Sequence, residues 1–393
     1  MRSKFFAILS LVVALLFFAD PAVGQRNPYK KRKGGGKNVS SYKRSSAGGK
    51  FRPYEYLRYG INALNYFGDL APISTRGVTD VSFTRPGTGI TYGARFNPSF
   101  AIAMNYNYGR IKGADFSTAN RSEVAASEYS RFTRNLSFRN NIHEFNIGGQ
   151  FYIIPEVNSV TYSQPINGYI FVGVGCFLHD PQGQIPEYDY QTYGPSAAEE
   201  GAPRLDQDPN FAQALSDRGL APGDWVKLRT LNTEGQGREG RQGVYKPFQW
   251  QIPINAGVEL HIPRTYFQIG VEFGFRYLFT DYLDDVSTTY VGLDTFEDPI
   301  ARIMSDRGSE PTFEGFERQL LADAAGYPLR IVQNNFGDET YYISGDVGSG
   351  IENSIRGNPD RNDFYFLTQL NIKFILPPNG IFKRSREAEA KAR

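Results

Sequence analysis

Apolar and polar residues alternate over the stretch from Phe248 to Phe279. Successive side chains of a β-strand point to opposite faces, so the alternation predicts two strands that each have an apolar and a polar face. Each run is about twice as long as a typical strand of a soluble sandwich. Only Pro263-Arg264-Thr265 separates the runs, which predicts a tight turn and a membrane-spanning hairpin. The apolar set is Phe248, Trp250, Ile252, Ile254, Ala256, Val258, Leu260 and Ile262, followed by Phe267, Ile269, Val271, Phe273, Phe275, Tyr277 and Phe279.

Six further segments repeat this alternation. Their apolar faces are Leu57, Tyr59, Ile61, Ala63 and Phe67; Ile90, Tyr92, Ala94 and Phe96; Phe100, Ile102, Met104, Tyr106 and Tyr108; Phe145, Ile147, Phe151 and Ile153; Ile170, Val172, Val174 and Cys176; and Phe364, Phe366, Leu370, Ile372, Phe374 and Leu376. With the hairpin they make eight strands, and single-chain bacterial outer-membrane barrels have an even number. The sequence therefore predicts an all-β protein, an eight-stranded antiparallel transmembrane β-barrel.

The connections between these strands alternate between short and long. The short ones are 97–99, 155–167 and 263–265, and the long ones run roughly over 70–88, 114–134, 180–246 and 284–361. Membrane barrels have short periplasmic turns and long extracellular loops, so this order places both termini in the periplasm. A secreted β-sandwich is the alternative fold.

The start of the chain predicts export. Arg2 and Lys4 precede the apolar run 5–19, and small residues at 22–24 offer a cleavage site before Gln25. This arrangement is typical of a cleaved signal peptide, because the run is shorter than the roughly 20 residues of a membrane-spanning anchor, the alternative. We expect a signal peptide at 1–24, a basic disordered periplasmic segment at 25–51, the barrel at 52–376 and a basic periplasmic tail at 377–393.

Composition agrees with a barrel. The chain has 25 Tyr and 30 Phe but only 3 Met and 1 Cys. Aromatic residues favour strands and form girdles where membrane barrels meet the two interfaces of the bilayer. The single Cys176 excludes an intramolecular disulfide, and no cysteine near the cleavage site offers a lipid anchor.

Several charged residues fall on the polar faces of the predicted strands. Side chains fill the interior of an eight-stranded barrel, and an unpaired buried charge is costly. We therefore expect these residues to form a lumen charge network that plugs the barrel, with an ion path as the alternative. They are Arg58, Arg95, Glu144, Glu259, Glu272, Arg276 and Lys373.

The two largest loops are rich in Gly, Pro, Asp and Glu. Loops of this length are usually functional or disordered. Carboxylates of Asp281, Asp284 and Asp285 suit a Ca²⁺ ion, but their spacing matches no loop motif. Solvated acids at the barrel rim are the expected interpretation, and we expect no cofactor.

Catalysis has little support in the sequence. The histidines are His143, His179 and His261, and a rim hydrolase would pair His179 with Asp180 or Asp281. No nucleophile motif accompanies such a pair. We therefore expect no enzymatic activity and no small-molecule substrate.

Both ends of the mature chain are basic. The cluster Lys30, Lys31, Arg32 and Lys33 lies in a stretch without Asp or Glu before Glu55, and the tail after Leu376 also carries Lys and Arg. The periplasmic compartment excludes nucleic acid as a partner. One interpretation is a solvated linker near anionic lipid. The other is docking onto an acidic periplasmic partner, with Arg264 of the short turn contributing and Glu156 and Thr265 as further candidates.

Two motifs resemble a known family. The first is Asn65-Tyr66-Phe67-Gly68-Asp69-Leu70, and the second runs from Gly274 to Val291 and includes Asp281, Tyr282, Asp284 and Asp285. Both resemble PorG-like outer-membrane proteins of Bacteroidetes-type bacteria, which belong to the type IX secretion and gliding machinery. The resemblance covers roughly 52–376 apart from the large loops. It implies a non-enzymatic barrel that helps to anchor a periplasmic secretion ring.

The sequence thus predicts a structural outer-membrane barrel whose partners are membrane lipid and periplasmic secretion-ring proteins. The first alternative is a small OmpA- or OmpX-like barrel that acts as a surface adhesin or envelope-stability protein. The second alternative is the rim-sited hydrolase.

Overall fold

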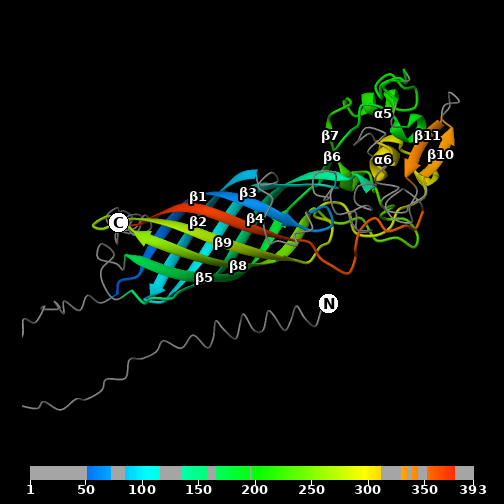
Figure 1. Cartoon of the computed structure of the whole chain (residues 1–393). Helices are drawn as coiled ribbons and strands as arrows, with labels where there is room; N and C mark the ends of the chain where they lie inside the picture. The colour runs from blue at the N-terminus through cyan, green and yellow to red at the C-terminus, as the bar shows by residue number, and fades with distance from the viewer. Residues whose placement is uncertain are drawn as a thin grey trace, which may run out of the picture.

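Eight long antiparallel strands form a closed barrel in the computed structural model (Figure 1), which describes residues 51–71, 85–115, 134–156, 165–194, 197–199, 201–310, 329–333, 339–343 and 352–376. The strands are β1 (Tyr54–Phe67), β2 (Arg85–Asn97), β3 (Phe100–Ala114), β4 (Ser137–Tyr152), β5 (Ile166–Leu178), β8 (Phe248–His261), β9 (Phe267–Leu278) and β12 (Phe364–Ile375). Each pairs with the next in this order, and β12 pairs back to β1, so the sheet closes on itself. The predicted eight-stranded antiparallel β-barrel is confirmed.

The two faces of the barrel wall follow the predicted register. In β9, Phe267, Ile269 and Val271 are exposed, whereas Gln268 is buried. A closed barrel satisfies its backbone hydrogen bonds within the wall, so such an apolar exterior can face lipid. Two predicted lipid-facing residues are buried instead. Ile252 is 7% exposed, where Tyr277 of β9 lies directly opposite it, and Leu376, just after the last strand, is 8% exposed.

The connections at the two ends of the barrel differ in length as expected. At one end the strands are joined across 98–99, 153–165 and 262–266, and we call this the short-turn end. The pairing of Tyr56 with Ile375 shows that the chain also enters and leaves the barrel there. Among the described residues, no helix is long and apolar enough to cross a membrane.

The described parts of two long connections, those between β5 and β8 and between β9 and β12, form a folded body at the other end (Figure 1). We call the described residues of 182–246, 284–310 and 352–361 the cap. Its elements are β6 (Gln182–Gln184), α4 (Tyr190–Tyr193), α5 (Ala212–Asp217), β7 (Trp225–Lys227), η3 (Leu228–Thr230), η4 (Leu293–Thr295) and α6 (Pro299–Ser305). A separate hairpin pairs β10 (Leu329–Gln333) with β11 (Glu339–Ile343). The cap continues the wall of the barrel, because β6 pairs with β4 and β7 pairs with β6.

One hydrophobic core joins the cap to the barrel. It includes Leu64 and Phe138 from the barrel strands and Ile185, Leu215 and Ile300 from the cap. These apolar side chains remove the rim of the barrel from solvent. The interpretation of the rim acids as solvated is therefore wrong: Asp281, Asp284 and Asp285 are 8%, 0% and 0% exposed.

Candidate functional site

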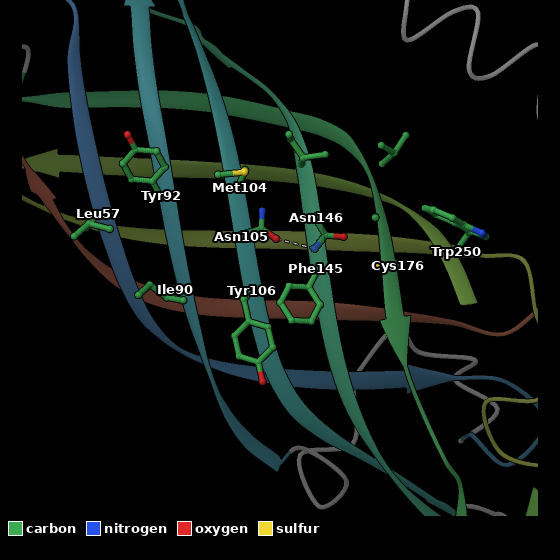
Figure 2. A pocket seen from close by; sticks show the side chains of 13 residues that line it. Leu57, Ile90, Tyr92, Met104, Asn105, Tyr106, Phe145, Asn146, Cys176 and Trp250 are labelled. Carbon is green, nitrogen blue, oxygen red and sulfur yellow. Dashed lines mark hydrogen bonds between the residues drawn. The ribbon is translucent and has the colours of Figure 1, made fainter. Parts of the chain in front are cut away.

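The outer wall carries an apolar groove of about 500 Å³ (Figure 2). Two rows of side chains, each in register across neighbouring strands, border it. One row is Leu57, Tyr92, Met104, Ile147 and Val174, and the other is Ile90, Tyr106, Phe145, Cys176 and Trp250. Between the rows, Asn105 and Asn146 hydrogen-bond to each other at 2.7 Å. The groove thus has apolar walls, while the polar groups beneath it are satisfied on the lumen side.

The lumen holds a network of ion pairs. Arg58 lies 2.5 Å from Glu259 and 3.1 Å from Glu272, and Lys373 lies 2.9 Å from Glu259. The side chains of these four residues are at most 6% exposed. The hydroxyl of Tyr169 also donates to Glu272 at 2.5 Å. Each carboxylate in this part of the lumen therefore has a cationic partner and a firm position.

A second ion pair lies nearer the cap. Arg276 donates to both carboxylate oxygens of Glu144, at 2.7 and 2.8 Å. The hydroxyl of Tyr365 donates to Glu144 at 2.6 Å. Asn255 connects the two groups of charges, because it accepts from Arg276 at 2.7 Å and donates to Glu272 at 2.8 Å. The hydrogen-bonded side chains thus form one continuous plug along the lumen.

Arg95 finds its partner outside the predicted network. It lies 2.7 Å from Glu156, a residue of the turn between β4 and β5, which also accepts from the hydroxyl of Tyr54 at 2.9 Å. The guanidinium of Arg95 covers the ring of Tyr152 at 3.6 Å. Four cations and only three acids on the predicted polar faces were the sequence signal for a missing carboxylate. Because Glu156 is 1% exposed, it is not an accessible docking residue as the sequence had led us to consider.

The two motifs of the family resemblance meet where the barrel joins the cap. We call this region, which includes residues 66–70, 281–285 and Asp363, the mouth. The hydroxyl of Tyr66 donates to Asp284, although 218 positions separate them. The backbone N–H of Leu70 donates to the same carboxylate at 3.2 Å. A Cβ atom on Gly68 would lie 1.9 Å from Oδ1 of Asp363 and 2.1 Å from the hydroxyl oxygen of Tyr66. Only glycine therefore allows this close approach.

Other motif residues make contacts at or beside the mouth. Asp69 accepts from the backbone N–H of Asn358 at 2.8 Å. Asp285 accepts from the hydroxyl of Tyr245 at 2.7 Å, and the ring of Tyr245 stacks on that of Tyr282 at 4.7 Å. On the outer wall, Phe67 stacks on Phe364 at 5.1 Å and Asn65 pairs across the sheet with Phe366. Asp69 and Tyr282 thus contact the cap, whereas Asn65 and Phe67 pack within the barrel wall.

The carboxylates of the mouth have strongly raised pKa values. Burial, followed by the negative charge of Asp69, raises the pKa of Asp284 to about 8. Burial raises the pKa of Asp281 to about 9 and that of Asp285 to about 6. Burial and the neighbouring Asp284 raise the pKa of Asp363 well above its usual range. Desolvation disfavours the charged form of an acid, and like charges add to this effect.

Two arginines lie at the mouth, but other groups engage them. Arg134 makes two hydrogen bonds to Asp115, at 2.7 and 2.8 Å. Arg356 lies 2.9 Å from Glu234, whose oxygens also accept from the backbone N–H groups of Ser287 and Thr288. Among the described residues, no group of three or more His, Cys, Asp or Glu side chains is placed to hold a metal ion.

Within the described part of the chain, His179 forms no hydrogen bond or ion pair with Asp180 or Asp281, the pairing expected of a rim hydrolase. Asp180 forms ion pairs with Lys227 at 3.0 Å and with Arg229 at 3.1 Å. His179 is 2% exposed, lies 3.4 Å from the amide nitrogen of Asn140, and has its pKa lowered to about 4 by burial. The imidazole is therefore a neutral member of the core at neutral pH.

No family model and no curated protein matches this sequence. Among solved structures the chain is similar to Ail, the attachment invasion locus protein of Yersinia pestis, at 7% identity and a TM-score of 0.30, over 82% of this chain and 99% of that one. It is also similar to the outer membrane protein OprG from Pseudomonas aeruginosa, at 7% identity and a TM-score of 0.31, over 84% and 98% of the two chains. Neisserial surface protein A gives 6% identity and a TM-score of 0.28, over 81% and 96%. At these scores the architecture rests on the strand pairing of this chain itself.

Some of the expected docking residues lie within the described part of the chain and some lie outside it. Lys30, Lys31, Arg32 and Lys33 lie outside the described residues, as do the predicted signal peptide and the tail 377–393. Arg264 is exposed in the turn between β8 and β9, with a backbone φ of 63°. It therefore presents a cation at the short-turn end.

Proposed function

We propose that this protein is a non-enzymatic barrel of a bacterial outer membrane that holds a periplasmic complex at the membrane through its short-turn end. The plugged lumen carries this proposal. Arg276 and Glu144, with side chains 0% and 1% exposed, and the Arg58–Glu259 pair occupy the interior where a channel would run. A barrel filled in this way works through its surfaces and its ends.

The exposed apolar side chains of the outer wall favour a lipid environment. Side chains such as Ile61, Trp250 and Leu370 are 63%, 58% and 64% exposed, and water would solvate them poorly. Hydrocarbon chains of the bilayer would cover them and fill the groove between the rows of Met104 and Tyr106. On this proposal membrane lipid is the first partner of the protein.

The short-turn end supports a periplasmic partner. The chain enters β1 and leaves β12 at that end, so the basic segments before 51 and after 376 start from it. Opposite charges steer association and fix the orientation of a partner. The resemblance to the PorG-like family would make that partner an acidic component of a type IX secretion ring.

The test removes the basic charges without touching the barrel. Lys30, Lys31, Arg32 and Lys33 are replaced with Gln, alone and together with deletion of 383–393. We expect normal heat-modifiable mobility on gels, a lower yield of co-purified periplasmic complex, and a further loss as salt rises, because salt screens exposed charges.

A matched control replaces four cations of the cap, Arg204, Arg218, Lys227 and Lys246, with Gln. This variant should recover the complex as the wild type does. Equal yield and equal salt sensitivity for the wild type and the variant without basic ends would reject the proposal.

The cap favours a second candidate function. The cap is a folded body in which Leu205, Phe211 and Leu215 are buried. A surface adhesin would present such a body outside the cell. Attachment of cells that survives loss of the basic ends, but not removal of the cap, would favour that function.

A further inference from the structure

Two buried carboxylates from opposite ends of the connection between β9 and β12 meet one barrel side chain at the mouth. Asp284 follows β9 and is 0% exposed, whereas Asp363 precedes β12 and is 2% exposed. The hydroxyl oxygen of Tyr66, from β1, donates to Asp284 and lies 3.4 Å from Oδ1 of Asp363. The group thus joins three segments at the base of the cap.

Few hydrogen-bond donors surround the carboxylates of Asp284 and Asp363. The backbone N–H groups of Leu70 and Val286 donate to Asp284, and that of Leu283 donates to Asp363 at 2.9 Å. Tyr66 has a single hydroxyl proton, which is directed at Asp284, so a proton on Asp363 would let that acid donate to the same oxygen 3.4 Å away. Among the described residues, neither carboxylate has an ion-pair partner.

The charged groups around the pair are mostly acids. Asp69 from the connection after β1, Asp281 after β9 and Glu234 from the cap face this region, and Tyr66 lies between the carboxylates. Arg134, which precedes β4, is the cation that acts on Asp284, but both of its hydrogen bonds to a carboxylate go to Asp115. Proton binding is therefore the remaining way to neutralise the pair.

We propose that Tyr66, Asp284 and Asp363 form a proton-held latch that fastens the cap to the barrel and weakens as the protons are lost. The raised pKa values of both acids agree with this geometry. A solvated Asp has a pKa of about 4, and the buried Asp284 has one of about 8. Opening of the latch releases protons between these values, so opening becomes easier as pH rises through this window and levels off above it.

The test measures opening of the cap in the full-length protein inserted in lipid vesicles. Limited proteolysis within the cap is followed from pH 5 to pH 8, with each rate divided by that of the denatured chain. For each proton released, wild-type opening should rise about tenfold per pH unit. Asp284→Asn, Asp363→Asn and the double variant should each lower this slope, the double variant most.

Two controls keep the result interpretable. Asp217→Asn changes an exposed carboxylate of the cap and should keep the wild-type slope. Heat-modifiable mobility verifies that each barrel is folded. Infrared spectra at neutral pH should show a protonated-carboxyl band that weakens in the double variant, while the buried Asp281 keeps its share of the band. An unchanged slope in the double variant, or an unchanged infrared band, would overturn the proposal.

Discussion

The lumen and the mouth both bury carboxylates, but they neutralise them in different ways. In the lumen, Glu144 receives two hydrogen bonds from Arg276, and Glu259 lies between Arg58 and Lys373. At the mouth, Asp284 and Asp363 receive backbone N–H groups and one tyrosine hydroxyl. Ion pairs keep their strength over a wide pH range, whereas a group that depends on a bound proton responds to pH. The ion pairs of the barrel interior should therefore persist over a wide pH range, whereas the contacts of the mouth should change with pH.

The difference follows from how each region is assembled. Lumen residues come from strands whose two-residue periodicity places opposite charges at fixed heights, so pairing is set by register. The mouth is assembled from connections, where Gly68 lets Asp363 approach Tyr66 closely.

The largest effect should come from breaking a lumen ion pair. Glu144→Gln leaves Arg276 buried without its carboxylate, which should lower the free energy of unfolding by about 3–5 kcal/mol. Urea unfolding in vesicles, followed by gel mobility, measures this loss. Asp206→Asn removes the exposed partner of Arg204 and should change stability by about 0–1 kcal/mol. Equal losses in the two variants would contradict the view that the plug stabilises the barrel.

A smaller effect is expected from crowding the mouth. In Gly68→Ala the new methyl group would overlap Asp363 and Tyr66, and such overpacking costs about 1–3 kcal/mol. Cleavage of the cap by protease should accelerate while the barrel stays folded. Gly243→Ala serves as the control, because a Cβ atom there meets nothing within 4 Å. If Gly243→Ala loosened the cap equally, the close approach at Gly68 would not explain the effect.

The smallest effect concerns His179, the buried histidine that directly follows β5. Burial lowers the pKa of His179 to about 4, below the value of about 6.5 for a solvated histidine. Its contribution to stability is complete above pH 6.5 and is lost as the pH falls toward 4, opposite in sign to that of Asp284. His179→Phe can still stack on Tyr245 but cannot titrate, so at pH 5 it should be about 1–2 kcal/mol less destabilised by acid than the wild type. Identical acid sensitivity of cap cleavage in both proteins would exclude this role.

The fold could be predicted from the sequence because strand periodicity is local. Alternation identified both faces of all eight barrel strands, apart from the burial of Ile252 and of Leu376 at the end of the last strand. The lumen charges could be predicted for the same reason, because the alternation of faces along each strand is enough to place Arg58 and Glu272 inside. The partner of Arg95 could not be predicted, because Glu156 lies in a turn, where side chains do not alternate between two faces.

The mouth could be predicted only in part. The family resemblance drew attention to Tyr66 and Asp284, but nothing local indicates that residues 218 positions apart share a hydrogen bond. The long connections were also expected to expose their acids. Their apolar residues, such as Phe211 and Ile300, have no strand-like alternation, so the core that they build with the barrel was not evident from the sequence.

Cys176 gives the wild-type chain a built-in attachment point for a spectroscopic probe. It is the single cysteine of the sequence, and it lies half-buried on the outer wall in the row that contains Phe145 and Trp250. A thiol-linked nitroxide or fluorophore there would report its depth in a bilayer through quenchers held at known heights. One label per chain would also let photobleaching steps count the barrels in each assembly, with every other side chain left as the cell makes it.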